Sequence, residues 1–472
     1  MEPPLLISEP LPFVKEFIAA LDAALKAHRP WGPGLSFAQR RWLGCCLMGI
    51  LITNTVCWAK FERASLGRYS LAALSWMFRH AKIPWERLLP LSVQVILRRY
   101  GITEGCLCLD DSDQRRSKVT QKIAYVHKLK DKASGGFIRG QSLIFLLLIT
   151  PPVTIPMGFV FYLPDPALTA WNQEDKRLKQ AGVPAKARPR KPPHNPSYPT
   201  KQALALARLK HFREAHPSIR VKCVLADALY GTGKFLNKAS NLFGGVQVVS
   251  QLRHHQNLRF RGKQYSVEQY FAKFPGVTQT IRIRGGEPVT VTVGSARLPV
   301  CAHGQKRFVI ALKYEGEENY RYLVATDLTW RTLDIVQAYT FRWLIEVFLA
   351  DWKAHEGWDA LTKQPGEEGS SRSLILSLLV DHCLLLHPDP LARIENKQPA
   401  YTVGSLSNRV KVDSLLMIIR ELVTADNPVE QLQRLAHQLE ELFPLNPSDK
   451  HMVNRDMGRL EPTPSLQYKA IA

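Results

Sequence analysis

Four polar side chains are spaced so that one face of a helix would carry them together. The segment 339–353 reads YTFRWLIEVFLADWK and contains strong helix formers but neither Pro nor Gly. At about 100° per residue, four of its side chains fall within a sector of roughly 60°: Tyr339, Arg342, Glu346 and Lys353. The carboxylate can bind a metal ion, and the other three groups can bind phosphate oxygens. The alternative interpretation is an ordinary amphipathic helix with an i,i+4 Arg–Glu pair.

The same segment carries a separate apolar stripe that would hold the helix against a core. The stripe is centred about 130° from the polar one, and its members are Phe341, Leu344, Ile345, Phe348 and Trp352. The pattern therefore predicts a helix that packs on one side and presents chemistry on another.

Two further acidic positions come at the ends of apolar runs. GCLCLDD ends in Asp110 and Asp111, and IRVKCVLAD ends in Asp227. Each run predicts a buried strand that carries a carboxylate into a crevice at its end. Because side chains alternate along a strand, the pattern does not decide between Asp110 and Asp111. An Asp at a strand end is also a common turn or cap residue. With Glu346, however, these acids suit two divalent ions about 4 Å apart acting on a phosphodiester.

The helical motif Tyr-x2-Arg-x3-Glu-x6-Lys resembles the signature of one branch of the bacterial DDE transposases, the insertion-sequence-four family. All four motif residues match in type and spacing, and Trp343 and Trp352 resemble the same branch. The resemblance covers roughly 105–355. One departure is Ala350, which stands where a relative is expected to have Lys. A phosphate contact is therefore either missing or supplied from elsewhere.

The resemblance implies a metal site built from three acids: Asp111, Asp227 and Glu346. Two Mg2+ ions would bind there, and Mn2+ can substitute. Family members tend to have the first metal-binding Asp directly before Ser or Thr, and Asp111 precedes Ser112. This favours Asp111 over Asp110 as the first ligand.

The resemblance also implies an activity and its partners. The protein would be a cut-and-paste transposase that binds double-stranded DNA, both the inverted-repeat ends and the target. Water would cleave at the transposon end, and the released 3′-hydroxyl would then attack target DNA. Tyr339, Arg342 and Lys353 would hold phosphates near the cleavage point, since Arg can do so bidentately. A homodimer is expected to hold both ends.

Aromatic residues beside the motif are further candidates for DNA contact. Members of the resembled branch flip a base onto an aromatic ring that precedes the helix. Tyr322 occupies the closest position here, and Tyr320 is the other choice; the alternative is that Tyr322 is an ordinary sheet residue. Trp343 lies about 40° from Tyr339 around the helix and faces either DNA or the core.

Composition agrees with a partner that is a polyanion. The chain has 472 residues with 63 Lys and Arg against 41 Asp and Glu, which gives a net charge of +22. Nucleic acid is the first candidate for a protein this basic, and the alternative is a generally basic protein without such a partner. The length and the 45% hydrophobic content predict a folded chain of several domains.

Cysteine usage and hydropathy indicate a cytoplasmic protein with no membrane partner, and the resemblance implies that it is nucleoid-associated. The eight Cys show neither paired nor zinc-binding spacing, as expected for thiols in a reducing compartment. The N-terminus lacks the basic region of a signal peptide. The most apolar run, LIFLLLI at 143–149, is too short to span a bilayer and predicts a buried strand.

The predicted fold class is α/β, with an RNase H-like mixed-sheet catalytic core and a β-rich insertion between helical N- and C-terminal regions. The predicted divisions are a helical DNA-end-binding region at 1–100, the first part of the core at 101–252, the β-rich insertion at 253–319, the completing helix at 320–365 and a helical region at 366–472. Ser36 and Ser70 are expected to cap helices in the first region.

Residues 171–200 differ in character from their surroundings. Pro is dense from 184 to 199, and basic residues stand between the prolines: Lys186, Arg188, Arg190 and Lys191. This composition predicts a loop or an extended basic arm that lies on a phosphate backbone. The alternative is a solvated linker.

Two other classes of protein fit the same residues. A non-transposing RNase H-like nuclease would cut DNA but fail to join its 3′ ends to a target. A non-catalytic DNA-binding protein would bind without a metal, and the three acids count against it. A strand-transfer assay separates these from a transposase.

Overall fold

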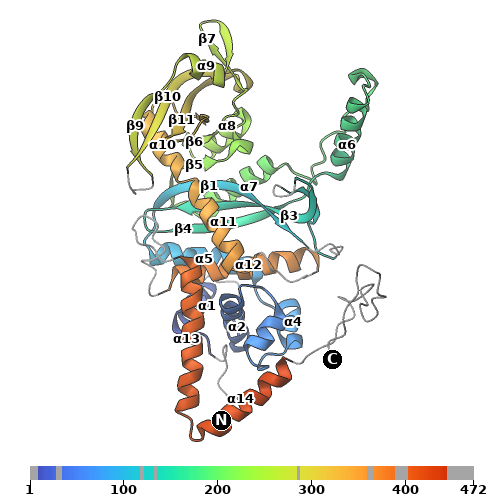
Figure 1. The fold of residues 1–472 in the computed structure, drawn as a ribbon, viewed down its shortest axis with the longest axis vertical. Coiled ribbons are helices and arrows are strands. Elements are labelled where there is room, and N and C mark those ends of the chain that lie inside the picture. Colours follow the sequence, from blue (N-terminus) through green and yellow to red (C-terminus); the bar gives the residue numbers. More distant parts are fainter. Residues whose placement is uncertain are drawn as a thin grey trace, which may run out of the picture.

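A large mixed β-sheet forms the middle and upper part of the molecule, and a group of helices forms the opposite end (Figure 1). This computed structural model describes residues 9–27, 34–116, 122–131, 135–283, 288–358, 365–387 and 402–443. The chain is thus α/β, as predicted.

Five strands form the central part of the sheet, in the order β4-β3-β1-β5-β6. Their bounds are β1 Glu104–Arg115, β3 Phe137–Ile149, β4 Thr154–Tyr162, β5 Arg220–Ala226 and β6 Gln247–Gln251. β1, β5 and β6 are parallel, whereas β3 is antiparallel to β1 and to β4. The short strand β2, His127–Lys130, pairs with the start of β3. The strands expected from the apolar runs at Asp110, 143–149 and Asp227 are therefore confirmed.

The segment predicted to be β-rich extends this sheet. β12 pairs with β6, and the order continues through β11 and β10 to β7 and β8, while β9 pairs with β10. The bounds are β7 Asn257–Phe260, β8 Lys263–Ser266, β9 Val277–Arg282, β10 Pro288–Val300, β11 Gln305–Tyr314 and β12 Arg321–Ala325. One short helix, α9 (Val267–Lys273), lies among them, capped by Ser266.

Two apolar layers cover the faces of the central sheet, because successive side chains of β1 point to opposite sides. Leu107 and Leu109 pack in the layer of α7 (Lys201–Ala215) and α8 (Gly233–Leu242). Cys108 packs in the other layer, which contains the apolar stripe of α11 (Trp343–His355). The stripe predicted for the 339–353 segment therefore does face a core.

The 339–353 segment is not one continuous helix, which corrects the prediction. α10 (Thr332–Thr340) ends before Phe341, and α11 begins at Trp343. At the junction, the Arg342 amide donates to the Tyr339 carbonyl at 3.0 Å, and the Ile345 amide donates to the Arg342 carbonyl at 3.2 Å. These i to i−3 bonds tighten the backbone to about three residues per turn, which rotates Tyr339 relative to the residues after it.

The helices from the two ends of the chain pack together (Figure 1). Their bounds are α1 Pro12–Ala27, α2 Phe37–Thr53, α3 Trp58–Ala64, α4 Leu71–His80, α5 Trp85–Arg99, α12 Gly366–Leu385, α13 Val403–Val423 and α14 Pro428–Leu442. Ser36 and Ser70 accept the capping hydrogen bonds of α2 and α4, as predicted. The apolar helix α12 lies against α2 and α5, so the regions 1–100 and 366–472 share one core.

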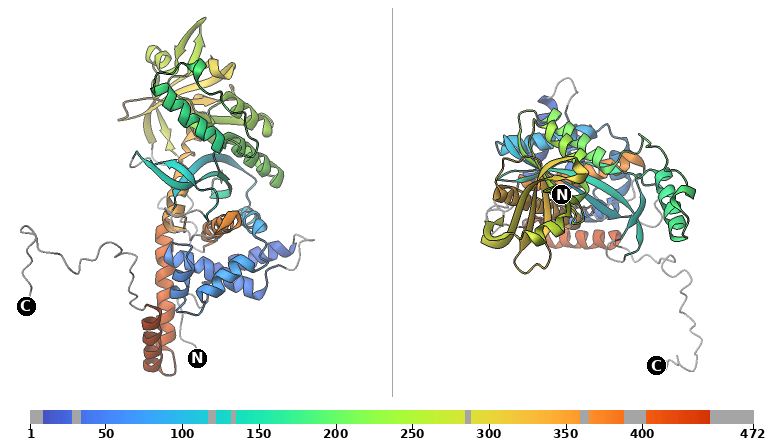
Figure 2. Two further views of the ribbon diagram at one scale, coloured as in Figure 1. Left: turned by 90° about the vertical axis from the view of Figure 1, so that its right-hand side faces the viewer. Right: turned by 90° about the horizontal axis from the view of Figure 1, so that it is seen from above.

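The 171–200 segment is partly helical, contrary to the prediction of a loop or extended arm. α6 spans Pro166–Gln180, and only the chain after it is irregular, apart from the single turn η1 at Ala185–Ala187. Pro166 is tolerated because it stands in the first turn, and the Asp165 side chain accepts from the Ala167 and Leu168 amides. α6 projects from the body of the molecule (Figures 1 and 2).

No helix among the described residues combines the length and apolar character needed to cross a bilayer. All eight cysteines lie in the described ranges, and each is a thiol without a disulfide.

We expect the packing of α11 against the sheet to depend on Trp352. This side chain is fully buried, and its ring centre lies 4.9 Å from those of both Phe145 and Trp358. The Trp352→Ala variant should lose about 3–5 kcal/mol of unfolding free energy, measured by urea denaturation. Trp343→Ala is the matched control, since Trp343 lies on the same helix and is 50% exposed; its loss should stay within about 0.5 kcal/mol. Equal losses would contradict this account.

Candidate functional site

Six carboxylates line one cavity of about 820 Å3, and four of them belong to the strand ends and the helix from which the sequence predicted a site. Asp110 and Asp111 come from β1, Asp227 follows β5, and Glu346 lies in the first turn of α11. The other residues that line the cavity are Ser112, Asp113, Lys130, Asp131, Ile138, Gln251, Arg342, Leu349, Ala350 and Lys353. The acids predicted to act together are therefore neighbours in space.

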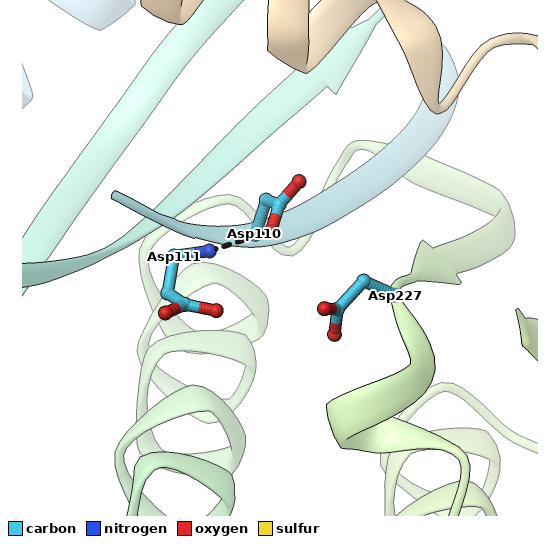
Figure 3. Close-up of side chains that lie close together, drawn as sticks. All are labelled: Asp110, Asp111 and Asp227. Atoms are coloured by element: carbon cyan, nitrogen blue, oxygen red, sulfur yellow. Dashed lines mark hydrogen bonds between the residues drawn. The ribbon is translucent and has the colours of Figure 1, made fainter. Parts of the chain in front are cut away.

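Parallel strand pairing brings the three aspartates together. Leu109 of β1 stands opposite Ala226 of β5, so the residues that follow each of them lie side by side. One carboxylate oxygen from each of Asp110, Asp111 and Asp227 lies within 4.8 Å of the others. In Figure 3, Asp110 and Asp111 leave β1 on opposite sides, and Asp227 faces them from the neighbouring strand end.

Glu346 is connected to this group through one guanidinium. Arg342 forms an ion pair with Glu346 on its own helix, and its Nη1 lies 3.3 Å from Oδ2 of Asp110. Arg342 thus stands between two of the four acids. Arg and Glu at i,i+4 make this pairing ordinary, but the contact with Asp110 depends on the fold.

Asp110 and Asp111 have different surroundings. Asp110 faces Arg342 and the α11 side, and its Oδ1 also accepts the Asp111 amide at 2.8 Å. Asp111 faces α7, where Lys201 Nζ lies 2.5 Å from its Oδ2. Since both approach Asp227, the choice of Asp111 over Asp110 as the first ligand stays a prediction. Of the two, Asp110 lies on the side of the cavity that holds Glu346.

Burial and mutual repulsion disfavour the charged form of these acids. Burial, followed by the nearby charge of Asp227, raises the pKa of Asp110 to about 7. Burial, followed by the charge of Asp111, also raises the pKa of Asp227. Burial is the larger cause for both acids and the neighbouring negative charge the smaller, and the charge of Arg342 offsets them only in part. This is the electrostatic condition that a bound cation would relieve.

Three lysines surround the acids, and only one was predicted. Lys353 lines the cavity as expected, and its Nζ lies 3.4 Å from the Asp113 carbonyl. Lys130 of β2 lines it from another side, and Lys201 pairs with Asp111. Ala350 also lines the cavity, and Lys130 and Lys353 are the two lysines in the described part of its lining. Sequence spacing carried no signal for Lys130 or Lys201, which come from a short strand and a distant helix.

The three aromatic candidates have different positions. Tyr339 is buried beneath the motif, with its ring centre 5.8 Å from the Arg342 guanidinium, and burial raises its pKa. Tyr322 is buried in β12, where its ring stacks on Phe271 with centres 6.1 Å apart. Neither residue is among those that line the cavity, and the contacts with DNA stay predictions. Trp343 is half exposed, which agrees with the outward alternative.

The chain matches no protein-family model, and no curated protein is significantly similar to it.

We predict that the charge of Asp110 lowers the stability of the metal-free protein at high pH. The pKa of Asp110 is about 7 in the folded state against 3.8 for an ordinary Asp, so its contribution is complete at low pH and is lost as pH rises through 7. The Asp110→Asn variant does not titrate there. In EDTA, its stability relative to the unsubstituted protein should therefore rise by about 2 kcal/mol between pH 5 and pH 8.

Asp334→Asn is the control for this pH dependence. Asp334 is an α10 carboxylate that pairs with Arg331, and this ion pair lowers its pKa. Its substitution should give a difference that does not rise between pH 5 and pH 8. Urea denaturation at each pH measures both variants, and a flat profile for Asp110→Asn would refute the raised pKa assigned to Asp110.

Proposed function

We propose that this chain is a DDE transposase that cleaves DNA at transposon ends and joins them to target DNA. The observation that carries the proposal is the cavity in which three aspartates lie within 4.8 Å of one another, beside Glu346 and several cationic side chains. A cytoplasmic, nucleoid-associated location follows from this function. The sequence motif that resembles the insertion-sequence-four family is the reason to prefer a transposase over another nuclease.

Strand order supports an RNase H-like core. The order β4-β3-β1-β5-β6, with β1, β5 and β6 parallel and β3 and β4 antiparallel neighbours, matches that architecture in direction and sequence of strands. The first acids lie on the central strand and the next acid on the adjacent parallel one. A later helix, α11, supplies the fourth. The strands β7 to β11, which lie within 253–319, would then be the insertion.

The residues present fit a pair of Mg2+ ions. Asp110, Asp111, Asp227 and Glu346 offer only oxygen ligands, which hard divalent cations prefer, and Mn2+ suits the same set. The pKa values of Asp110 and Asp227 are raised by burial and then by neighbouring acidic charge, and a bound cation would offset both effects. When bound, two such ions would activate the attacking oxygen and stabilise the leaving oxygen of a phosphodiester.

The cationic side chains would place the DNA strand over these carboxylates. Arg342 can bind two non-bridging phosphate oxygens, and Lys353 and Lys130 can bind neighbouring phosphates from other sides of the cavity. Hydrolysis adds water to phosphorus and releases a 3′-hydroxyl. In strand transfer that hydroxyl attacks a target phosphodiester and displaces a 3′-oxygen, which leaves with a proton.

The test uses duplex DNA carrying the inverted repeats that flank the gene, incubated with Mg2+ or Mn2+. Cleavage should require the metal and should fall by at least about 100-fold in Asp227→Ala and in Glu346→Gln. Asp110→Asn and Asp111→Asn, assayed side by side, show which acid contributes more. The exposed Asp334→Asn variant should cleave normally. Undiminished cleavage by Asp227→Ala would refute the metal-nuclease mechanism, and cleavage without joining would favour the non-transposing nuclease.

An exposed apolar surface supports the dimer that this function needs. Side chains between 37% and 70% exposed follow one another along the two C-terminal helices: Val412, Leu415, Leu416, Ile419 and Val423 on α13, and Val429, Leu432, Leu439 and Phe443 on α14. Large exposed apolar patches mark interaction surfaces. Asp413 and Arg420 lie on the same side of the exposed apolar residues of α13. In a dimer with a two-fold axis near Leu416, Asp413 of each copy would therefore pair with Arg420 of the other copy.

We predict that the unsubstituted protein is a dimer at micromolar concentration and that Leu416→Glu makes it a monomer. Near a two-fold axis, this substitution brings two carboxylates together and removes apolar contact. Sedimentation velocity measures the mass of each protein. Gln433→Glu adds the same charge on α14 outside the apolar surface and should leave the dimer intact. A monomeric parent protein, or equal effects of the two variants, would contradict the interface.

A further inference from the structure

Residues 166–200 form an arm that contributes little to the core of the protein. None of the 15 residues of α6 is buried, and the helix stands away from the body in Figure 1 and in the right-hand view of Figure 2. The chain after α6 folds back on it: the Trp171 indole donates to the Pro189 carbonyl at 2.8 Å, and Arg188 pairs with Asp175 at 2.9 Å. The arm thus consists of α6 and the irregular chain after it, which packs back against α6.

The exposed charges of the arm that are not in ion pairs are all positive. Its two acids are both used internally, because Glu174 pairs with Arg177 and Asp175 with Arg188. Five other cationic residues are exposed and form no ion pair with a carboxylate in the described part of the chain: Lys176, Lys179, Lys186, Arg190 and Lys191. An arm with this surface would attract a polyanion.

The base of the arm adjoins the candidate active site. The arm leaves the sheet after Tyr162, the last residue of β4, and returns at Lys201, the first residue of α7. Lys201 Nζ lies 5.3 Å from the centre of the Tyr162 ring and 2.5 Å from Asp111 Oδ2. A ligand that extends from the four acids toward α7 therefore meets the arm.

We infer that the arm is a second DNA-binding element, which holds duplex phosphates beside the cleaved bond; this inference rests on the proposed function. A helix of 15 residues is about 22 Å long, which corresponds to roughly six base pairs of B-form DNA. The arm exposes no large apolar side chain. Protein interfaces usually need aromatic or apolar anchors, whereas a phosphate backbone needs only cations, so DNA is the partner that this surface fits.

The test compares two variants that each lose four positive charges. The arm variant changes Lys176, Lys186, Arg190 and Lys191 to Gln. The control changes Arg253, Arg259, Lys263 and Lys273 to Gln, four exposed residues on and beside β7, β8 and α9, at the top of the molecule in Figure 1. Binding to a fluorescent duplex is measured by anisotropy over a range of salt concentrations. The arm variant should bind at least about 10-fold more weakly and have a salt slope smaller by about 2–4, while the control changes neither.

A second measurement locates the arm on DNA. An iron chelate attached at a Lys186→Cys substitution should cut an inverted-repeat duplex within about six base pairs of the cleavage position. Cuts on the transposon side mean that the arm holds the end itself, and cuts on the other side mean that it holds flanking or target DNA. Equal affinities and salt slopes of the two charge variants, or cuts scattered along the duplex, would overturn the inference.

The outcomes separate this inference from the proposed function. If the protein cleaves DNA with Mg2+ while the arm variant binds like the control, the arm inference is wrong and the function stands. If the arm variant alone loses DNA affinity but no cleavage occurs with either metal, the arm inference stands and the transposase proposal is wrong.

Discussion

The parallel pairing of β1 with β5 is the constraint on which the candidate site depends. It brings Asp110, Asp111 and Asp227 together at adjacent strand ends, in surroundings that raise the pKa values of Asp110 and Asp227. Carboxylates held this close repel one another, so the fold must oppose the repulsion. The apolar layers on both faces of the sheet supply that opposition, together with the guanidinium of Arg342 and the ammonium of Lys201. The site is thus held together by the sheet rather than by its own charges.

This arrangement explains why the cationic side chains around the acids come from so many elements. Arg342 belongs to the turn between α10 and α11, Lys201 to the start of α7, and Lys130 to β2. Each can bind a phosphate, and two of them now bind a carboxylate of the site. In each of these ion pairs, a DNA phosphate would attract the cationic side chain and a divalent cation would attract the carboxylate. Each ligand would therefore release the side chain that the other one binds. Substrate and metal binding are therefore expected to favour one another.

The C-terminal helices and the α6 arm have different surfaces, which suit different partners. The helices α13 and α14 expose a run of apolar side chains, whereas the α6 arm exposes cations and no large apolar group. An apolar helical face can be covered by a second copy of the chain, and a cationic arm can bind a phosphate backbone. The chain thus has three distinct surfaces: an apolar surface, a cationic surface and an acidic cavity.

The sequence by itself determined the strands, the helices and most of the acids, because periodicity, capping residues and apolar runs are local signals. The runs before Asp110 and Asp227 are strands, Ser36 and Ser70 cap helices, and Glu346 lies on a helix with an apolar face. Only the tertiary structure decided that Lys201 meets Asp111, that Arg342 reaches Asp110, and that Tyr322 and Tyr339 are buried away from the cavity. The tightened turn before α11 and the helical part of the 166–200 arm were also not predicted. Long-range contacts depend on strand order and on how helices lie across the sheet. Neither of these can be recognised from the local periodicity of the sequence.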